Sequence, residues 1–303
     1  MKIPSVLFVV GAMLPISAHS QVVISGFLAD PAGTDSPYEF VQFTATQPIN
    51  FAETAFSVVL ANNGTASPSG WRAGGNLTYG FDLTSGEIAI GETFYVGGSG
   101  RRINGSGSAD ASGLRWLRTI DTGSSAGDGL GTSQTNGVLG NGSANADGIA
   151  VFAGSIATLT TSSRPVDAIF FGSGIGTAKP ATGGFLMPDN DRYQSSAVMG
   201  EAGNMFLFDN PAASSFVSLV GTFDANAQSW TSPRTASSVF LTSSSPLSSL
   251  TAGVTVIPEP SPLALLLAFA TIGAAVRAAF TPAPRRRKPA DGSARGNPEQ
   301  STH

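Results

Sequence analysis

Several residue types that commonly carry catalysis are missing or scarce in this chain. Its 303 residues include no cysteine and only two histidines, His19 and His303. The lack of cysteine excludes disulfides, thiolate metal sites and cysteine nucleophiles. No histidine lies between these two positions, so the intervening residues cannot form a Ser-His-Asp triad, a Cys-His pair or a His-ligated metal site. The commonest routes to hydrolysis and to transition-metal binding are therefore closed to residues 20–302.

Charged residues are also few, at 12% of the chain. Between residues 21 and 257 there are nine Lys or Arg against 17 Asp or Glu, a net charge of about −8. Such a surface repels a phosphate backbone, so we expect no nucleic-acid partner. Lys179 is the only lysine in that segment, and no S-x-x-K motif contains it, so a Ser-Lys nucleophile has no support.

The N-terminus has the pattern of a secretory signal peptide. Lys2 precedes a mostly apolar stretch from Val6 to Ile16, and Ala18-His19-Ser20 places small residues at the −3 and −1 positions of a cleavage site. The apolar stretch is too short to span a bilayer comfortably. We therefore predict a signal peptide over residues 1–20, cleaved between Ser20 and Gln21.

What the chain does contain favours strands joined by turns. Gly accounts for 37 residues, Ser, Thr and Asn are frequent, and no helical pattern precedes Pro262. We predict an all-β ectodomain over residues 21–241, an antiparallel immunoglobulin-like sandwich with long polar loops, followed by a flexible Ser/Thr-rich stalk over 242–255. The expected strands are Val22–Leu28, Glu39–Thr44, Phe56–Leu60, Leu77–Asp82, Phe94–Val96, Ile149–Phe152, Val166–Phe171, Met205–Phe208, Phe216–Thr222 and Ser238–Leu241.

The first two strands carry a family resemblance. Ile24–Val59 contains the turn Asp30-Pro31-Ala32-Gly33-Thr34-Asp35 and the strand sequence Glu39-Phe40-Val41-Gln42-Phe43. This opening resembles a lamin-tail-like domain, in which Gln42 stands where an acidic residue is usual. Gly86–Gly98 and Asp147–Gly172 resemble later strands of the same family. The resemblance covers about residues 22–175 and implies an immunoglobulin-type sandwich.

The C-terminal part has three elements in a fixed order. Pro258-Glu259-Pro260-Ser261 is followed by an apolar run that predicts a single transmembrane helix over residues 263–280. Eighteen helical residues span about 27 Å, just enough to cross a hydrocarbon core. The basic cluster Arg285-Arg286-Arg287-Lys288 then marks the cytoplasmic side and stops translocation, which leaves residues 289–303 as a cytoplasmic tail.

This order, over residues 256–288, resembles the PEP-CTERM sorting signal of Gram-negative bacteria. The resemblance implies recognition by exosortase, a membrane-embedded cysteine transpeptidase-like enzyme, and delivery from the inner membrane to the outer surface or extracellular matrix. It also implies an association with bacteria that produce exopolysaccharide. The prolines on either side of Glu259 hold it extended, the form that suits an enzyme cleft.

Some loops are rich in Asp and Asn, whose side-chain oxygens are the ligands that Ca²⁺ prefers. A calcium site is therefore the one metal-binding alternative. Neither an EF-hand nor a nonapeptide repeat is present, and an ordinary solvated loop explains the same composition. The candidate ligands are Asp121, Asp128, Asn145, Asp147, Asp189 and Asp191.

Three functions follow from these observations. The first is a non-enzymatic surface or matrix protein, with an adhesive or structural role and no cofactor. The second is a carbohydrate- or Ca²⁺-dependent binding module, with Trp71, Trp116 and Trp230 as stacking candidates. The third is a surface hydrolase that uses paired carboxylates. Its candidates are Glu87, Glu92, Asp189, Asp191 and Glu201.

Overall fold

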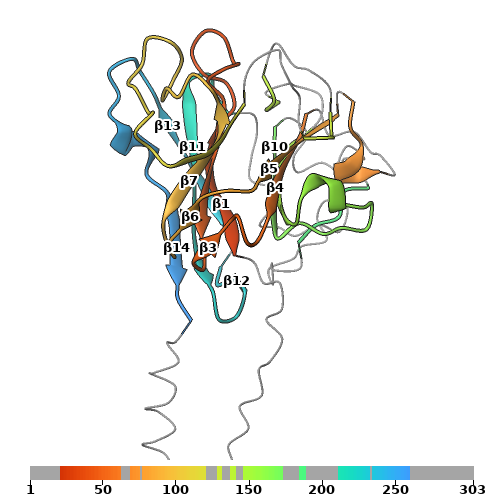
Figure 1. The fold of residues 1–303 in the computed structure, drawn as a ribbon. Coiled ribbons are helices and arrows are strands. Elements are labelled where there is room, and N and C mark those ends of the chain that lie inside the picture. Colours follow the sequence, from red (N-terminus) through yellow and green to blue (C-terminus); the bar gives the residue numbers. More distant parts are fainter. Residues whose placement is uncertain are drawn as a thin grey trace, which may run out of the picture. The chain divides into compact units, whose positions relative to one another are not determined.

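The computed structural model describes residues 21–62, 69–75, 77–120, 128–131, 137–140, 146–172, 184–188, 211–232 and 234–259. These residues form an all-β body with short 3₁₀ turns and no α-helix (Figure 1). Its larger sheet has eight strands: β1 (Val22–Leu28), β2 (Phe40–Ala45), β7 (Thr93–Gly98), β8 (Trp116–Ile120), β11 (Ser215–Asp224), β12 (Ser229–Trp230), β13 (Thr235–Phe240) and β14 (Gly253–Ile257).

The second sheet has four strands in the order β10-β9-β4-β5. They are β4 (Phe56–Ala61), β5 (Thr78–Leu83), β9 (Asp147–Ala153) and β10 (Asp167–Phe171). A small separate ladder joins β3 (Ile49–Asn50) to β6 (Glu87–Ile88). The 3₁₀ turns are η1 (Gly70–Arg72), η2 (Ile156–Thr158) and η4 (Leu247–Leu250).

The main hydrophobic core lies between the two sheets. Phe27 of β1 and Phe171 of β10 meet there with ring centroids 4.4 Å apart, and alternate residues of β2, β4, β7 and β9 belong to the same buried cluster. Alternation buries one face of each strand, because successive side chains point to opposite sides. This sandwich-like packing confirms the all-β prediction at its coarser level.

Both sheets also carry packed side chains on their outer faces, which explains why several strands are buried at every position. On the four-stranded sheet, Val59 and Phe170 pack under Trp71 of η1 and under Phe185. On the eight-stranded sheet, Phe40 packs with residues that include Leu241 and Leu250. A strand buried on two faces needs a continuous apolar sequence rather than an alternating one.

Two strand pairings depart from the expected antiparallel arrangement. β7 pairs with β8 in parallel, and β11 pairs with β14 in parallel. Parallel partners require a crossover connection, and residues 99–115 and 225–252 are long enough to provide one. The remaining described ladders are antiparallel.

The prediction of a flexible stalk over residues 242–255 is wrong. Leu250, at the end of η4, is buried with 3% of its surface exposed, and β14 continues the sheet to Ile257. The first compact unit of the chain extends to Glu259. The Ser/Thr-rich composition is typical of a linker, but the leucine and the strand-forming Val254–Ile257 gain burial and backbone pairing that composition does not reveal.

Gln42 of β2 connects this C-terminal segment to the sheet. Its side-chain amide nitrogen donates to the Tyr95 hydroxyl (2.8 Å) and to the Leu250 carbonyl (2.6 Å), and its oxygen accepts from the Ser25 hydroxyl (3.1 Å). A carboxylate has no N–H to donate to the Leu250 carbonyl. The amide of Gln42 therefore fits these surroundings, whereas a carboxylate at the same position would not.

The expected strands agree with the structure over most of the body. β1 has the predicted bounds, and β2, β4, β5, β7, β9, β10, β11 and β13 overlap the predicted ranges. The strand expected at Met205–Phe208 and the helix expected at 263–280 lie outside the described residues. Among the residues that are described, no helix is long and apolar enough to cross a bilayer.

Candidate functional site

The predicted processing segment begins at the end of β14. Pro258 and Glu259 follow Ile257 directly, and both are exposed. The side-chain amide of Gln47, in the turn after β2, donates a hydrogen bond of 2.9 Å to Glu259 Oε1. Glu259 is therefore held beside the folded body. Pro260, Ser261 and the basic residues Arg285, Arg286, Arg287 and Lys288 lie outside the described residues.

The predicted signal-cleavage junction lies at the same turn. Gln21, the residue after the predicted cut, accepts a hydrogen bond of 2.9 Å from the Thr46 backbone N–H through its own carbonyl, and Val22 is in register with Ala45. Ser20 lies outside the described residues. Thr46 and Gln47 thus bring residues 21 and 259, the two ends of the described body, to neighbouring positions.

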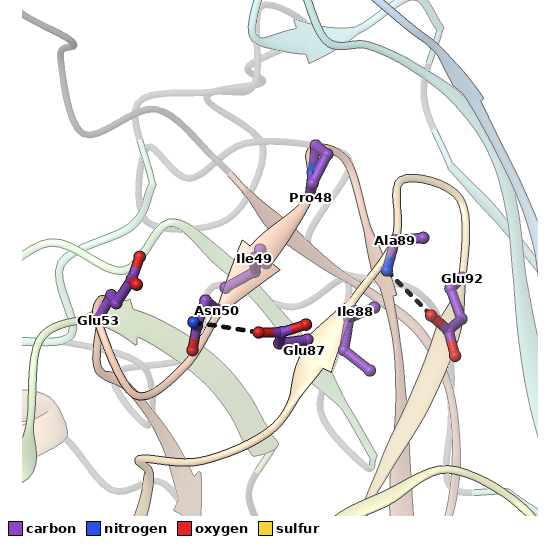
Figure 2. A pocket seen from close by; sticks show the side chains of 8 residues that line it. All are labelled: Pro48, Ile49, Asn50, Glu53, Glu87, Ile88, Ala89 and Glu92. Atoms are coloured by element: carbon purple, nitrogen blue, oxygen red, sulfur yellow. Dashed lines mark hydrogen bonds between the residues drawn. The ribbon is translucent and has the colours of Figure 1, made fainter.

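An open acidic hollow of about 590 Å³ is formed by the β3–β6 ladder (Figure 2). It brings together Glu87 and Glu92, two of the predicted carboxylate candidates, with Glu53 nearby. Asn50 Nδ2 donates to Glu87 Oε1 (3.3 Å), and the Ala89 N–H donates to Glu92 Oε2 (2.9 Å). Figure 2 shows the Glu87 carboxylate hydrogen-bonded to Asn50 on the facing strand, and the Glu92 carboxylate hydrogen-bonded to Ala89, the residue after β6.

This arrangement suits the capping of turns better than acid–base chemistry. All three glutamates are exposed to solvent, whereas a general acid at neutral pH is normally a carboxyl group sheltered from water. Asp189, Asp191 and Glu201 lie outside the described residues. Within the described ranges, no three ligating side chains are placed to hold a metal ion.

The two described calcium candidates lie in different surroundings. Asp128 is half-exposed and pairs with Arg118 (2.9 Å), and its other oxygen accepts from the Asp82 N–H (2.8 Å). Asp147 is fully buried on β9, with its carboxylate close to the backbone of Gly140. Asp128 thus already has a cationic partner. Asp121, Asn145, Asp189 and Asp191 lie outside the described residues.

The tryptophans proposed as carbohydrate-stacking residues are mostly packed inside the body. Trp71 and Trp230 are 4% and 0% exposed, and Trp116 is half-buried against Phe40 and Tyr95. A sugar ring stacks on an accessible aromatic face, which the two buried rings do not offer.

A buried carboxylate that the sequence did not single out lies immediately before β2. Glu39 is 2% exposed, and its Oε2 accepts hydrogen bonds from the backbone N–H groups of Val138 (2.6 Å) and Leu139 (3.2 Å). Among the described residues, no donor reaches its Oε1. Burial raises the pKa of this carboxyl well above its ordinary value, and the charges of Asp35 and Asp30 raise it further.

The segment 137–140 fits closely between two buried carboxylates. A Cβ atom at Gly137 would lie 2.4 Å from Glu39 Oε2, and one at Gly140 would lie 2.0 Å from Asp147 Oδ1. Gly137 also has a φ of +108°, which disfavours other residues. Glycine at both ends allows the backbone between them to approach both acids. The arrangement fixes this segment to the sandwich.

Comparisons with known proteins leave the family open. Neither a protein-family model nor a curated protein matches the chain. A solved structure of a DUF4876 family protein from Bacteroides thetaiotaomicron is similar over 80% of this chain and 72% of that chain, with 10% sequence identity and a TM-score of 0.37. A likeness of this degree assigns no function.

Proposed function

We propose that the chain is an exported, non-enzymatic protein of the bacterial surface or extracellular matrix, delivered by exosortase processing of its C-terminal segment. The observation that carries this proposal is the order of elements from Val256 to Lys288: an extended Pro-Glu-Pro segment, an apolar run and a basic cluster. The signal-peptide pattern at residues 1–20 supports export independently.

The body in front of that segment is consistent with a structural or adhesive role in an exopolysaccharide-rich envelope. It has a large apolar core, a hydrogen-bonded Gln42 side chain inside the sheet, and no histidine or cysteine between residues 20 and 302. The connection between β1 and β2 contains the lamin-tail-like turn, and these two strands pair in an antiparallel ladder. We infer an immunoglobulin-like sandwich of that kind as the finer fold assignment.

The location of Glu259 supports its proposed role as the recognition residue. It is exposed and lies two residues beyond the last strand, between two prolines that keep the backbone extended. An enzyme that binds an extended segment can reach it without entering the core. This accessibility distinguishes Glu259 from the buried acids Glu39 and Asp167.

Expression of the full chain in hosts with and without exosortase tests the proposal. Pulse–chase labelling followed by mass spectrometry should show a shortened product only when the enzyme is present. Glu259→Ala should reduce that processing at least tenfold, whereas Glu53→Ala, which changes an exposed glutamate in the acidic hollow, should leave it unchanged. Processing of the Glu259→Ala chain at the normal rate, or an unprocessed wild-type chain, would contradict the proposal.

A further inference from the structure

The strand before the processing segment is part of the folded body. β14 pairs with β11 along its whole length, from Gly253 opposite Val220 to Ile257 opposite Asp224. The carbonyl of Ile257 accepts a further hydrogen bond of 2.9 Å from the Ala225 N–H. The backbone is therefore fixed up to residue 257.

The preceding residues are fixed as well. Leu250 is buried, and its carbonyl accepts the hydrogen bond from Gln42. The carbonyl of Thr251 accepts from the Ser218 hydroxyl at 3.1 Å. These hydrogen bonds and the pairing of β14 hold the backbone on the N-terminal side of Pro258 against the sheet.

Chain geometry limits how far Glu259 can move from the body. Two residues span at most about 7 Å, so Glu259 stays within that distance of Ile257 while β14 is paired. An enzyme that binds Glu259 must work close to the folded edge made by β14 and the turn at Thr46–Pro48. In this position the Glu259 carboxylate already accepts a hydrogen bond from Gln47.

We propose that Gln47 is a positioning residue that holds the Glu259 carboxylate against the folded body and slows its recognition by the processing enzyme. This inference rests on the proposed function. The enzyme must satisfy the Glu259 charge with its own donors, so the Gln47 hydrogen bond has to break before or during binding. A donor on the protein itself thus competes with the donors of the enzyme for one carboxylate.

The competition sets the rate at which the folded precursor is released. A hydrogen bond to a charged group at an exposed site shifts an equilibrium by a small factor, because water replaces the lost donor. We therefore expect Gln47→Ala to increase the processing rate about two- to fivefold. Gln47→Glu, which places a second negative charge beside Glu259, should accelerate it by at least as much.

Pulse–chase measurement of processing of the full chain in an exosortase-containing host provides the test. Thr255→Ala serves as the matched control, since Thr255 is an exposed β14 side chain that lies near the same edge. Limited proteolysis of each precursor verifies that the sandwich is folded. Equal or slower processing of Gln47→Ala relative to the wild type would overturn the inference.

A second variant keeps the test independent of any folding defect at Gln47. Insertion of four Gly/Ser residues between Ile257 and Pro258 should raise the rate by a similar factor, because Glu259 then leaves its position beside Gln47. Gln47→Ala added to this insertion should have no further effect, and an effect of the original size there would also overturn the inference. A wild-type chain that is never processed contradicts the proposed function itself, whereas a processed chain that is insensitive to Gln47 contradicts only this inference.

Discussion

Two regions of the body each bury a carboxylate, and they compensate its charge in different ways. In the first, Asp167 of β10 is fully buried and forms two hydrogen bonds with the Arg234 guanidinium, at 2.9 and 3.0 Å. In the second, Glu39, the residue before β2, is 2% exposed and accepts hydrogen bonds only from backbone N–H groups, while Asp30 and Asp35 lie near enough to oppose its ionisation. The first acid has a cation, and the second has none among the described residues.

This difference determines how each acid contributes to the stability of the fold. Asp167 links the sheets, since it also accepts a hydrogen bond of 2.7 Å from the Ile24 N–H, and Arg234 lies over the Trp230 ring at 4.3 Å. Burial raises the pKa of the Asp167 carboxyl as well, but the Arg234 charge and the Ile24 N–H oppose that shift and favour the ionised form. A lone buried carboxyl favours its protonated form instead, so its contribution to stability depends on pH.

The largest expected effect comes from removing the cation of the first region. Arg234→Met leaves the Asp167 charge buried without a cation and should lower the free energy of unfolding by about 3–5 kcal/mol. Urea denaturation followed by tryptophan fluorescence measures the loss. The double variant Asp167→Asn, Arg234→Met has no lone charge and should recover part of it. A single-variant cost below about 1 kcal/mol, or a double variant no more stable than the single, would contradict the interpretation.

Glu39, in the second region, should make the free energy of unfolding depend on pH. Because the folded pKa of Glu39 lies above the ordinary value of 4.5, the folded state holds an extra proton between these two values. The stabilisation is complete below pH 4.5 and is lost as the pH rises through the folded pKa. The slope in that interval reaches at most about 1.4 kcal/mol per pH unit for one group.

Glu39→Gln isolates this contribution. The amide oxygen can still accept from Val138 and Leu139, but the side chain no longer titrates. We expect the free energy of unfolding of the variant, measured by urea titration from pH 4 to pH 9, to decline less with rising pH than that of the wild type. Asp167, whose pKa burial also raises, is present in both proteins and contributes equally to both profiles. Asp110→Asn, at an exposed site, should keep the wild-type profile. Parallel profiles for Glu39→Gln and the wild type would show that Glu39 is ionised in the folded state throughout.

The sequence indicates neither region, for a physical reason. Arg234 stands alone in a Ser/Thr-rich stretch, and its partner is 67 residues away. Glu39 belongs to the strand motif that gives the lamin-tail-like resemblance, yet its surroundings come from Val138 and Leu139, 99 and 100 residues further on. Local patterns predict which residues form strands, but the compensation of a buried charge depends on the packing of distant segments.

The same distinction separates the strands that were predicted from those that were missed. β1 and β4 are mainly apolar, with one serine each, and their burial on two faces follows from this composition. β14 forms because it pairs with another strand, and that pairing leaves no local pattern in the sequence. The two-residue strands β3, β6 and β12 are too short to give a recognisable pattern. For the candidate site, the Pro258-Glu259 segment is legible in the sequence, whereas its contact with Gln47 follows only from the folded arrangement.

The smallest expected effect tests whether burial is the variable that matters. Arg118 and Asp128 form an ion pair of 2.9 Å with about a third of each side chain exposed, at 33% and 31%. Arg118→Met should cost about 0.2–1 kcal/mol of unfolding free energy, because water can solvate the Asp128 carboxylate once its partner is gone. The cost should fall further in 1 M salt, which screens exposed charges, whereas the cost of Arg234→Met should change little. Equal costs for the two arginine variants at both salt concentrations would show that burial does not set the difference between the two pairs.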